Sequence, residues 1–154
     1  MPKGKPGFYI CSQCRVEKPL SEFQARYTDP RDSRCPSLVK VNWCKDCTRA
    51  YMKVYSHRRR AERKFRVLVA YSGPIPKCAC CGELEVRFLT VDHIERGGAK
   101  HRKSIGKGGD TFYTWLEESN FPPGFRILCY NCNCCTSQGG VCPHEEKRLA
   151  QAAD

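Results

Sequence analysis

The fold is decided by three stretches, Cys78-Ala-Cys-Cys81-Gly82, Asp92-His93 and Cys129-Tyr-Asn-Cys132-Asn133. Two Cys-x-x-Cys pairs therefore flank an Asp-His dipeptide, and an asparagine directly follows the second pair. Four cysteines in two such pairs are typical of a tetrahedral structural zinc site, which leaves no position open for water. Asp92 and Asn133 offer oxygen atoms instead, and these suit a hard cation such as Mg²⁺ or Mn²⁺. These stretches predict a small domain in which zinc holds a candidate reactive centre together.

The cysteines predict metal sites rather than disulfides. The chain has 154 residues and 13 cysteines, an odd number, and eight of them form four Cys-x-x-Cys pairs, a spacing typical of zinc ligands. Residues 1–7 lack the apolar segment of a secretory signal peptide. We therefore expect two structural Zn²⁺ ions and a cytoplasmic protein. The expected ligands are Cys11, Cys14, Cys44 and Cys47 for the first zinc, and Cys78, Cys81, Cys129 and Cys132 for the second.

The net positive charge lies entirely in the N-terminal half of the chain. Residues 1–70 contain 17 Lys and Arg against 6 Asp and Glu, whereas residues 71–154 contain 10 of each class. A basic half joined to a neutral half that carries the reactive residues predicts a polyanionic partner such as DNA. The sequence contains no run of about 18 apolar residues, so we expect no membrane span.

A long basic helix is predicted between the two cysteine units. From Asp46 to Tyr71 the pattern is helical, and Gly73-Pro74 ends it. We expect its apolar stripe to pack on the neighbouring zinc units, and its arginines to contact phosphates because only two acidic residues along the helix can neutralise them. The predicted segments are a four-cysteine zinc module (1–50), a basic linking helix (51–73) and a C-terminal domain (74–154). The stripe comprises Tyr51, Val54, Ala61, Phe65 and Leu68, and the expected DNA contacts are Arg58, Arg59, Arg60 and Arg63.

Alternating and helical patterns place short elements in both cysteine units. In the N-terminal module we expect a strand at 8–10, a turn at 20–23 and a loop at 24–42. The C-terminal domain should contain strands at 86–93 and 125–128, helices at 111–118 and from 133, and a terminal helix at 145–152. A basic loop is predicted at 95–109. The expected fold class is therefore a small, zinc-stapled α+β protein. The loop residues expected to contact DNA are Lys100, His101, Arg102 and Lys103.

The Asp-His pair has the chemistry that phosphodiester hydrolysis needs. That reaction requires a cation that stabilises negative charge and a base that activates water. His93, with an ordinary pKa of about 6.5, is a competent base near neutral pH. Neighbours in a regular strand point to opposite faces, so Asp92 and His93 could act on one phosphate only where the strand ends or bends. We expect the zinc to hold that strand end against the helix that carries Asn133.

These motifs resemble those of phage HNH endonucleases with a ββα-metal active site, the superfamily that includes recombination endonuclease VII. Over residues 78–144 the likeness includes Leu-Thr-Val-Asp-His, Gly-Gly-x-Lys-His-Arg-Lys, Phe-Tyr-x-Trp-Leu, Leu-Cys-x-Asn-Cys-Asn and Val-Cys-Pro-His. Residues 9–51 are similar to a four-cysteine zinc module often fused ahead of such domains. The resemblance implies His93 as catalytic general base, and Asp92 and Asn133 as ligands of a catalytic Mg²⁺ or Mn²⁺. It implies that a ββα-metal domain follows the zinc module and the predicted basic helix, and that the cell is a bacterial or phage-infected host.

Two positions depart from the HNH pattern. The middle asparagine of many HNH motifs corresponds to Gly124, so support for the base must come from another residue. The second helical histidine of some members would fall near Ser137, which favours oxygen ligands over an all-histidine metal site. His101 could bind a phosphate, stabilise the transition state or simply be solvated.

The cysteines outside the four pairs leave alternatives open. Cys142 and His144 could join Cys134 or Cys135 in a third metal site, or the thiols could simply be buried. Cys35 and Cys80 have no assigned role, although Cys80 could replace a neighbouring zinc ligand.

Three functions are compatible with these features. The leading one is a metal-dependent DNA endonuclease, with a homodimer as one route to double-strand cleavage. The alternative is a non-catalytic zinc-ribbon nucleic-acid-binding protein, which would use the basic helix but would not need Asp92, His93 and Asn133. A thiol-redox or metal-storage protein would leave the basic helix unexplained.

Overall fold

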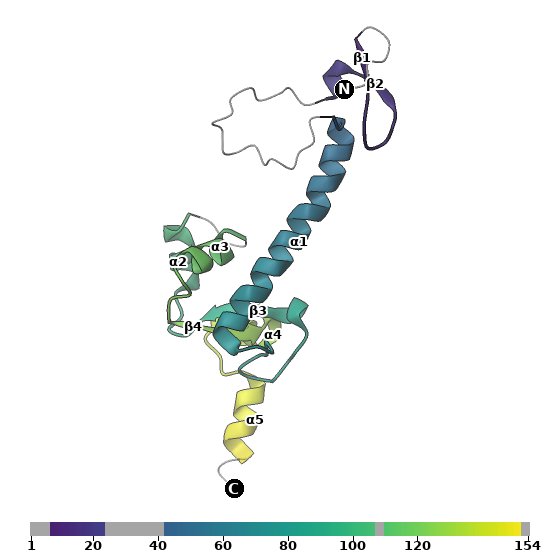
Figure 1. Ribbon diagram of the computed structural model, residues 1–154. Helices are drawn as coiled ribbons and strands as arrows, with labels where there is room; N and C mark the ends of the chain where they lie inside the picture. Colours follow the sequence, from purple (N-terminus) through teal and green to yellow (C-terminus); the bar gives the residue numbers. More distant parts are fainter. Residues whose placement is uncertain (1–6, 24–41, 107–109, 152–154) are drawn as a thin grey trace. The chain divides into compact units, whose positions relative to one another are not determined.

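The computed structural model describes residues 7–23, 42–106 and 110–151 of the chain (Figure 1). It is a small mixed α+β structure with cysteine clusters that could hold metal ions. The chain forms two compact units, Met1–Arg58 and Arg59–Asp154. The division falls inside one long helix, whereas the sequence predicted that helix as a separate linking segment. Cys35 and positions 24–41 of the predicted loop lie outside the described residues.

The N-terminal unit has a two-stranded ribbon and a very small core. Strands β1 (Phe8–Ile10) and β2 (Glu17–Pro19) pair antiparallel, and a turn of 3-10 helix, η1 (Leu20–Glu22), follows them. These elements include the predicted strand at 8–10 and the predicted turn at 20–23. The buried core consists of Cys11, Phe23 and Cys44. Within the described residues of this unit, so small a core buries little apolar surface to offset the conformational entropy of the chain, which favours stabilisation by a metal ion.

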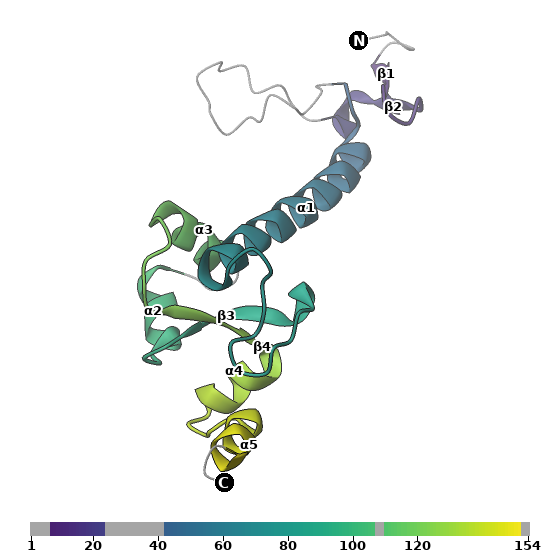
Figure 2. The ribbon, with the colours of Figure 1, turned by 60° about the horizontal axis from the view of Figure 1, so that its bottom comes forward.

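The C-terminal unit is organised around one antiparallel strand pair. Strand β3 (Leu89–His93) pairs with β4 (Phe125–Cys129) in a register that runs from Leu89 opposite Cys129 to His93 opposite Phe125. Figure 2 shows the two strands side by side, with the next helix continuing from the end of β4. The helices of this part are α2 (Gly98–Ser104), α3 (Asp110–Glu118), α4 (Tyr130–Ser137) and α5 (Pro143–Gln151).

Burial in this unit follows the periods of its elements. Leu89 and Val91 alternate along β3 and are buried, as the two-residue period of a strand requires. Phe112 and Leu116 are four residues apart on α3 and are also buried. The apolar side chains form one continuous core, which includes Val67, Leu68, Leu89, Val91, Phe112, Leu116, Ile127 and Leu128.

Strand β2 was not predicted, α5 starts two residues before the predicted 145, and three further elements differ from the sequence prediction in kind or extent. The strand predicted at 86–93 starts with a 3-10 turn, η2 (Val86–Phe88), because the Glu85 side chain accepts a hydrogen bond from the backbone N–H of Arg87. The predicted loop at 95–109 contains α2, since its glycines lie outside the run of helix-forming residues Ala99–Lys103. Helix α4 begins three residues before the predicted start at 133.

Helix α1 (Lys45–Ser72) extends one residue beyond the predicted span at each end. Its apolar stripe is only partly used, because Leu68 and the adjacent Val67 are fully buried while Val54 is 70% exposed and Phe65 is 45% exposed. The expectation that the whole stripe packs on the zinc units is therefore wrong. None of the helices in the described part of the chain is both long and apolar enough to cross a membrane.

Arginines near the C-terminal end of α1 form ion pairs with carboxylates of α3. The Arg63 guanidinium lies 2.7 Å from Asp110 through Nη1 and 3.2 Å from Glu117 through Nε, and its side chain is 15% exposed. The acids of α3 therefore neutralise some of these arginines, in addition to the two acids along α1 that the sequence alone indicates. Arg63 thus connects two helices, and its role as a DNA contact stays a prediction.

Candidate metal centres and reactive pocket

The N-terminal unit contains the first expected cysteine tetrad. The sulfur atoms of Cys11, Cys14, Cys44 and Cys47 all lie within 4.8 Å of one another. The backbone N–H of Cys44 donates a hydrogen bond to Sγ of Cys11 over 3.2 Å. Burial opposes ionisation of Cys11, but the N–H groups of Cys14, Cys44 and Gln13 more than compensate and lower its pKa to about 6. This tetrad could therefore hold a structural zinc ion.

The second expected tetrad lies in the C-terminal unit. Cys78 and Cys81 come from a tight turn closed by Gly82, which has a φ of 80°, whereas Cys129 ends β4 and Cys132 lies in the first turn of α4. The four sulfur atoms lie within 4.8 Å of one another, and the Sγ atoms of Cys81 and Cys129 are 3.7 Å apart. Neighbouring sulfurs around tetrahedral zinc are about 3.8 Å apart when each Zn–S bond is about 2.3 Å. This tetrad could also hold structural zinc.

A pocket of ≈ 560 Å³ brings together the three residues expected to carry the chemistry. Asp92 and His93 reach it from the end of β3, and Asn133 reaches it from α4. The pocket is rich in cationic side chains, because Arg96, Arg102 and Arg126 also line it. Arg96 and Arg126 were not singled out by sequence reasoning. Only the cross-strand register opposite Asp92 could have indicated Arg126.

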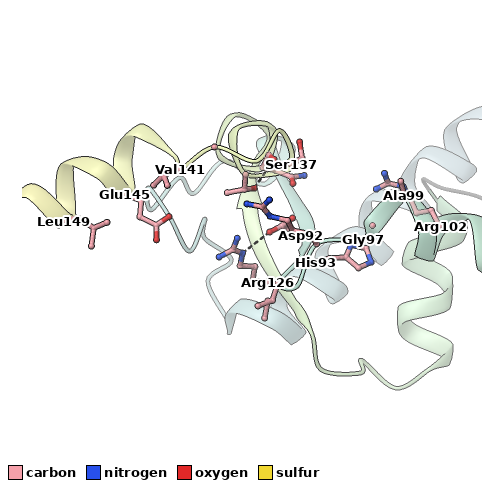
Figure 3. Close-up of a pocket in the computed structure, with 16 residues that line it drawn as sticks. Asp92, His93, Gly97, Ala99, Arg102, Arg126, Ser137, Val141, Glu145 and Leu149 are labelled. Atoms are coloured by element: carbon pink, nitrogen blue, oxygen red, sulfur yellow. Dashed lines mark hydrogen bonds and ion pairs between the residues drawn. The ribbon is translucent and has the colours of Figure 1, made fainter.

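Helix α5 supplies a second wall that the sequence did not predict. Glu145 and Leu149 lie one helical turn apart on α5 and line the pocket together with Val141, which precedes the helix. Figure 3 shows these three residues on the side of the pocket away from Gly97 and Ala99. The four-residue spacing of Glu145 and Leu149 in the sequence indicates that they share one face of a helix. It does not indicate that this face lines the pocket.

His93 is held among aromatic rings and beside a second histidine. Its Nε2 atom lies 2.9 Å from Nδ1 of His101, and its ring centroid is 4.8 Å from that of Phe125. Burial lowers the pKa of His93, and the charges of His101 and Arg102 lower it further. His93 therefore favours the neutral form, in which one ring nitrogen is free to accept a proton.

Gly98 permits this close arrangement. A Cβ atom added at Gly98 would lie 2.8 Å from Nδ1 of His93, which is too short for a non-bonded contact. Any larger side chain at this position would push the imidazole away. The two glycines at 97–98 are therefore needed for different reasons. Gly98 leaves room for the His93 ring, and Gly97 adopts a φ of 82°, which glycine tolerates better than other residues.

Asp92 is oriented by its partner across the strand pair. Arg126 lies opposite Asp92 in the β3–β4 register, and its Nε donates a hydrogen bond to Oδ2 over 2.9 Å. Figure 3 shows Asp92 turned toward Arg126 and His93 turned toward the segment of Gly97 and Arg102. The two neighbours therefore point in different directions, although both line the pocket at the end of the strand.

The remaining predicted DNA contacts fall on two helices. Arg60 is exposed on α1, with its Nε 3.7 Å from Asp110. Lys100, Arg102 and Lys103 are exposed on α2, whereas His101 is half-buried against the aromatic cluster. Arg58 and Arg59 are also exposed, on the part of α1 that precedes Arg60. His101 is thus a neighbour of His93 rather than a freely solvated residue.

No family model, no curated protein and no solved structure matches this chain. Its function must therefore be inferred from the side chains that line the pocket and from the cysteine clusters.

Proposed function

We propose that this protein is a metal-dependent DNA endonuclease of the HNH type, with strands β3 and β4 and helix α4 as its ββα-metal element. The observation that carries the proposal is the pocket itself, because Asp92, His93 and Asn133 line it together. Arg96, Arg102 and Arg126 add positive charge around the same space. A carboxylate, an amide and a neutral imidazole surrounded by arginines suit a phosphodiester better than an uncharged substrate.

The oxygen atoms of Asp92 and Asn133 fit a hard divalent cation. One carboxylate oxygen of Asp92 already accepts a hydrogen bond from Arg126, but a carboxylate has enough lone pairs to bind a cation as well. Asn133 adds a neutral carbonyl oxygen. A bound Mg²⁺ or Mn²⁺ would stabilise negative charge on the phosphate and on the leaving oxygen. Arg126 would orient the Asp92 carboxylate, and the pocket arginines would bind the phosphate.

His93 would act as the general base. With Nε2 directed at His101, the proton acceptor for a water molecule would be Nδ1 of His93. This requires that His93 Nε2 carries a hydrogen and donates it to Nδ1 of His101. His101 would then fix the tautomer and orientation of the base, a role that the HNH pattern gives to the asparagine that Gly124 replaces here.

The metal assignment predicts that loss of a ligand can be compensated by more metal. Asp92→Ala and Asn133→Ala should nick supercoiled plasmid DNA slowly at low magnesium and recover part of the lost rate as magnesium or manganese is raised. The reason is that removing a ligand lowers occupancy of a site that a higher metal concentration refills. Plasmid nicking measured across a metal titration tests this prediction, with Ser137→Ala as a control that alters the same pocket. Wild-type cleavage by Asn133→Ala at low magnesium would remove Asn133 from the metal site.

The same assay separates the proposed enzyme from a non-catalytic zinc-ribbon protein. The basic residues of α1 would serve either protein, whereas only a nuclease needs the Asp92, His93 and Asn133 set. A purified chain that binds DNA but does not nick it with any divalent metal would contradict the nuclease proposal.

His101 should be needed for the rate of cleavage and not for DNA binding. We expect His101→Ala to lower kcat by about 10-fold, because the base then loses the partner that fixes its tautomer, a contribution smaller than that of the base itself. His101→Asn should restore much of the rate, since its amide oxygen can occupy the position of Nδ1. Single-turnover cleavage and DNA affinity measured side by side test this. Equal loss in both variants, or a loss confined to affinity, would refute the positioning role.

The arginine run on α1 should provide salt-dependent affinity. Replacing Arg58, Arg59 and Arg60 together with alanine should weaken DNA binding. The slope of the logarithm of the binding constant against the logarithm of the salt concentration should also become shallower, by roughly 0.9 for each lost phosphate contact. Cleavage at saturating DNA should persist. Binding titrations at several salt concentrations test this, and Lys147→Ala with Arg148→Ala removes charge from α5 as a control. If the triple variant kept the wild-type salt dependence, these three arginines would not be the phosphate contacts.

A further inference from the structure

A third group of metal-ligating side chains lies beside the second cysteine tetrad. The donor atoms of Cys80, Cys132, Cys142 and His144 all lie within 4.8 Å of one another. Nδ1 of His144 is 3.6 Å from Sγ of Cys132 and 3.3 Å from Sγ of Cys142, and these two sulfurs are 3.6 Å apart. Around tetrahedral zinc with ordinary bond lengths, a sulfur and a nitrogen ligand are about 3.6 Å apart. The three distances are thus close to those between neighbouring ligands of a tetrahedral zinc ion.

Apolar packing explains only part of this arrangement. Cys132 and Cys142 are almost fully buried, at 0% and 1% exposure, and buried thiols often behave simply as small apolar groups. His144, however, is an exposed residue at the start of α5, and its imidazole nitrogen is directed at both buried sulfurs. An exposed imidazole that turns toward two thiols has the geometry of a ligand.

Cys132 belongs to both groups. It is the fourth sulfur of the tetrad with Cys78, Cys81 and Cys129, and it is also a member of the group with Cys80, Cys142 and His144. Seven side chains therefore surround two positions that together require eight tetrahedral contacts. Seven side chains can make eight contacts if one thiolate binds both metal ions, and a thiolate sulfur has enough lone pairs to do so.

We propose that the C-terminal unit holds two zinc ions bridged by the Cys132 thiolate. One ion would be bound by Cys78, Cys81, Cys129 and Cys132, and the other by Cys80, Cys132, Cys142 and His144. Within the described residues, Cys134 and Cys135 belong to none of the metal-ligating groups. The third site therefore uses Cys80 and Cys132 in place of the Cys134 or Cys135 that the sequence suggested.

The bridged pair would connect the reactive pocket to the end of the described chain. Cys132 directly precedes Asn133, so the bridge would fix the first turn of α4 from which Asn133 reaches the pocket. Cys142 and His144 lie between Val141 and Glu145, which line the opposite wall. The second zinc would thus hold α5 against α4, and the pocket would lose that wall without it.

Metal stoichiometry tests the second ion directly. Native mass spectrometry of the full chain should show three zinc ions, one in the N-terminal unit and two in the C-terminal unit. His144→Ala and Cys142→Ser should each reduce the count to two, because a site with three ligands including a shared one binds zinc much more weakly. Cys134→Ser, an exposed cysteine on α4, should leave the count at three. A wild-type chain with two ions would overturn the proposal, as would an unchanged count in a His144→Ala, Cys142→Ser double variant.

The bridge itself can be tested on the wild-type chain without any variant. After zinc is exchanged for cadmium, two of the cadmium NMR signals should show coupling to each other through the shared Cys132 sulfur. Two uncoupled signals would contradict the bridge. Neither measurement depends on cleavage, so a chain that holds the bridged pair but does not nick DNA would refute the proposed function and leave this inference intact.

Discussion

His93→Ala should lower the rate of DNA cleavage by about 10²–10⁴-fold while magnesium and DNA continue to bind. The reason is that a base within the pocket removes a proton from the attacking water, and no other pocket residue offers a neutral imidazole. The environment favours this role, because burial lowers the pKa of His93 and the positive charge of Arg102 also lowers it. The neutral form then predominates at neutral pH, which is the form that can accept a proton.

The measurement is a single-turnover cleavage rate at saturating magnesium and DNA. Raising the metal concentration should not restore His93→Ala, in contrast to Asp92→Ala and Asn133→Ala, since metal cannot replace a missing base. His57→Ala offers a matched control, because His57 is an exposed histidine on α1 outside the pocket. Cleavage by His93→Ala at the wild-type rate would mean that another group activates the water.

Regular patterns in the sequence predicted much of the fold. The strand at 125–128 and the helices at 46–71 and 111–118 appear within a residue or two of their expected bounds, because hydrophobic period and the Gly and Pro breaks determine them locally. Helix α2 was missed because five glycines in 95–109 favoured a loop, although its middle consists of helix-forming residues. The prediction used the composition of the whole segment, but the glycines lie toward its two ends and leave the middle free to form a helix.

The candidate site was predicted in its residues but not in its surroundings. Spacing around the Asp-His pair indicated Asp92, His93 and Asn133, and all three line one pocket. The partners of these residues depend on tertiary contacts, which no spacing reveals. Arg126 faces Asp92 only through the strand register, and His101 of α2 lies within 2.9 Å of His93 only in the folded chain. Cys80 likewise joins Cys142 and His144 only in three dimensions.

Metal removal should unfold the N-terminal unit before the C-terminal unit. Among the described residues of the N-terminal unit, the buried apolar core is Cys11, Phe23 and Cys44, so two of these three residues are themselves expected zinc ligands. The C-terminal unit has a larger core, with Leu89, Leu116 and other apolar residues fully buried. A structural zinc can contribute on the order of 10 kcal/mol of apparent folding free energy, which a three-residue core cannot replace.

The two tryptophans of the chain allow this order to be measured. Trp43 packs beside the N-terminal core, with its ring 5.3 Å from that of Tyr51, whereas Trp115 packs against the C-terminal core. In a Trp115→Phe background, a chelator should shift the Trp43 emission toward that of an exposed indole. In a Trp43→Phe background, the Trp115 emission should change only at higher chelator concentration. Cys11→Ser should produce the Trp43 change without chelator, and the exposed Cys134→Ser should not. If Trp43 kept its native emission in the fully metal-free chain, a metal ion at the N-terminal tetrad would not be what stabilises this unit.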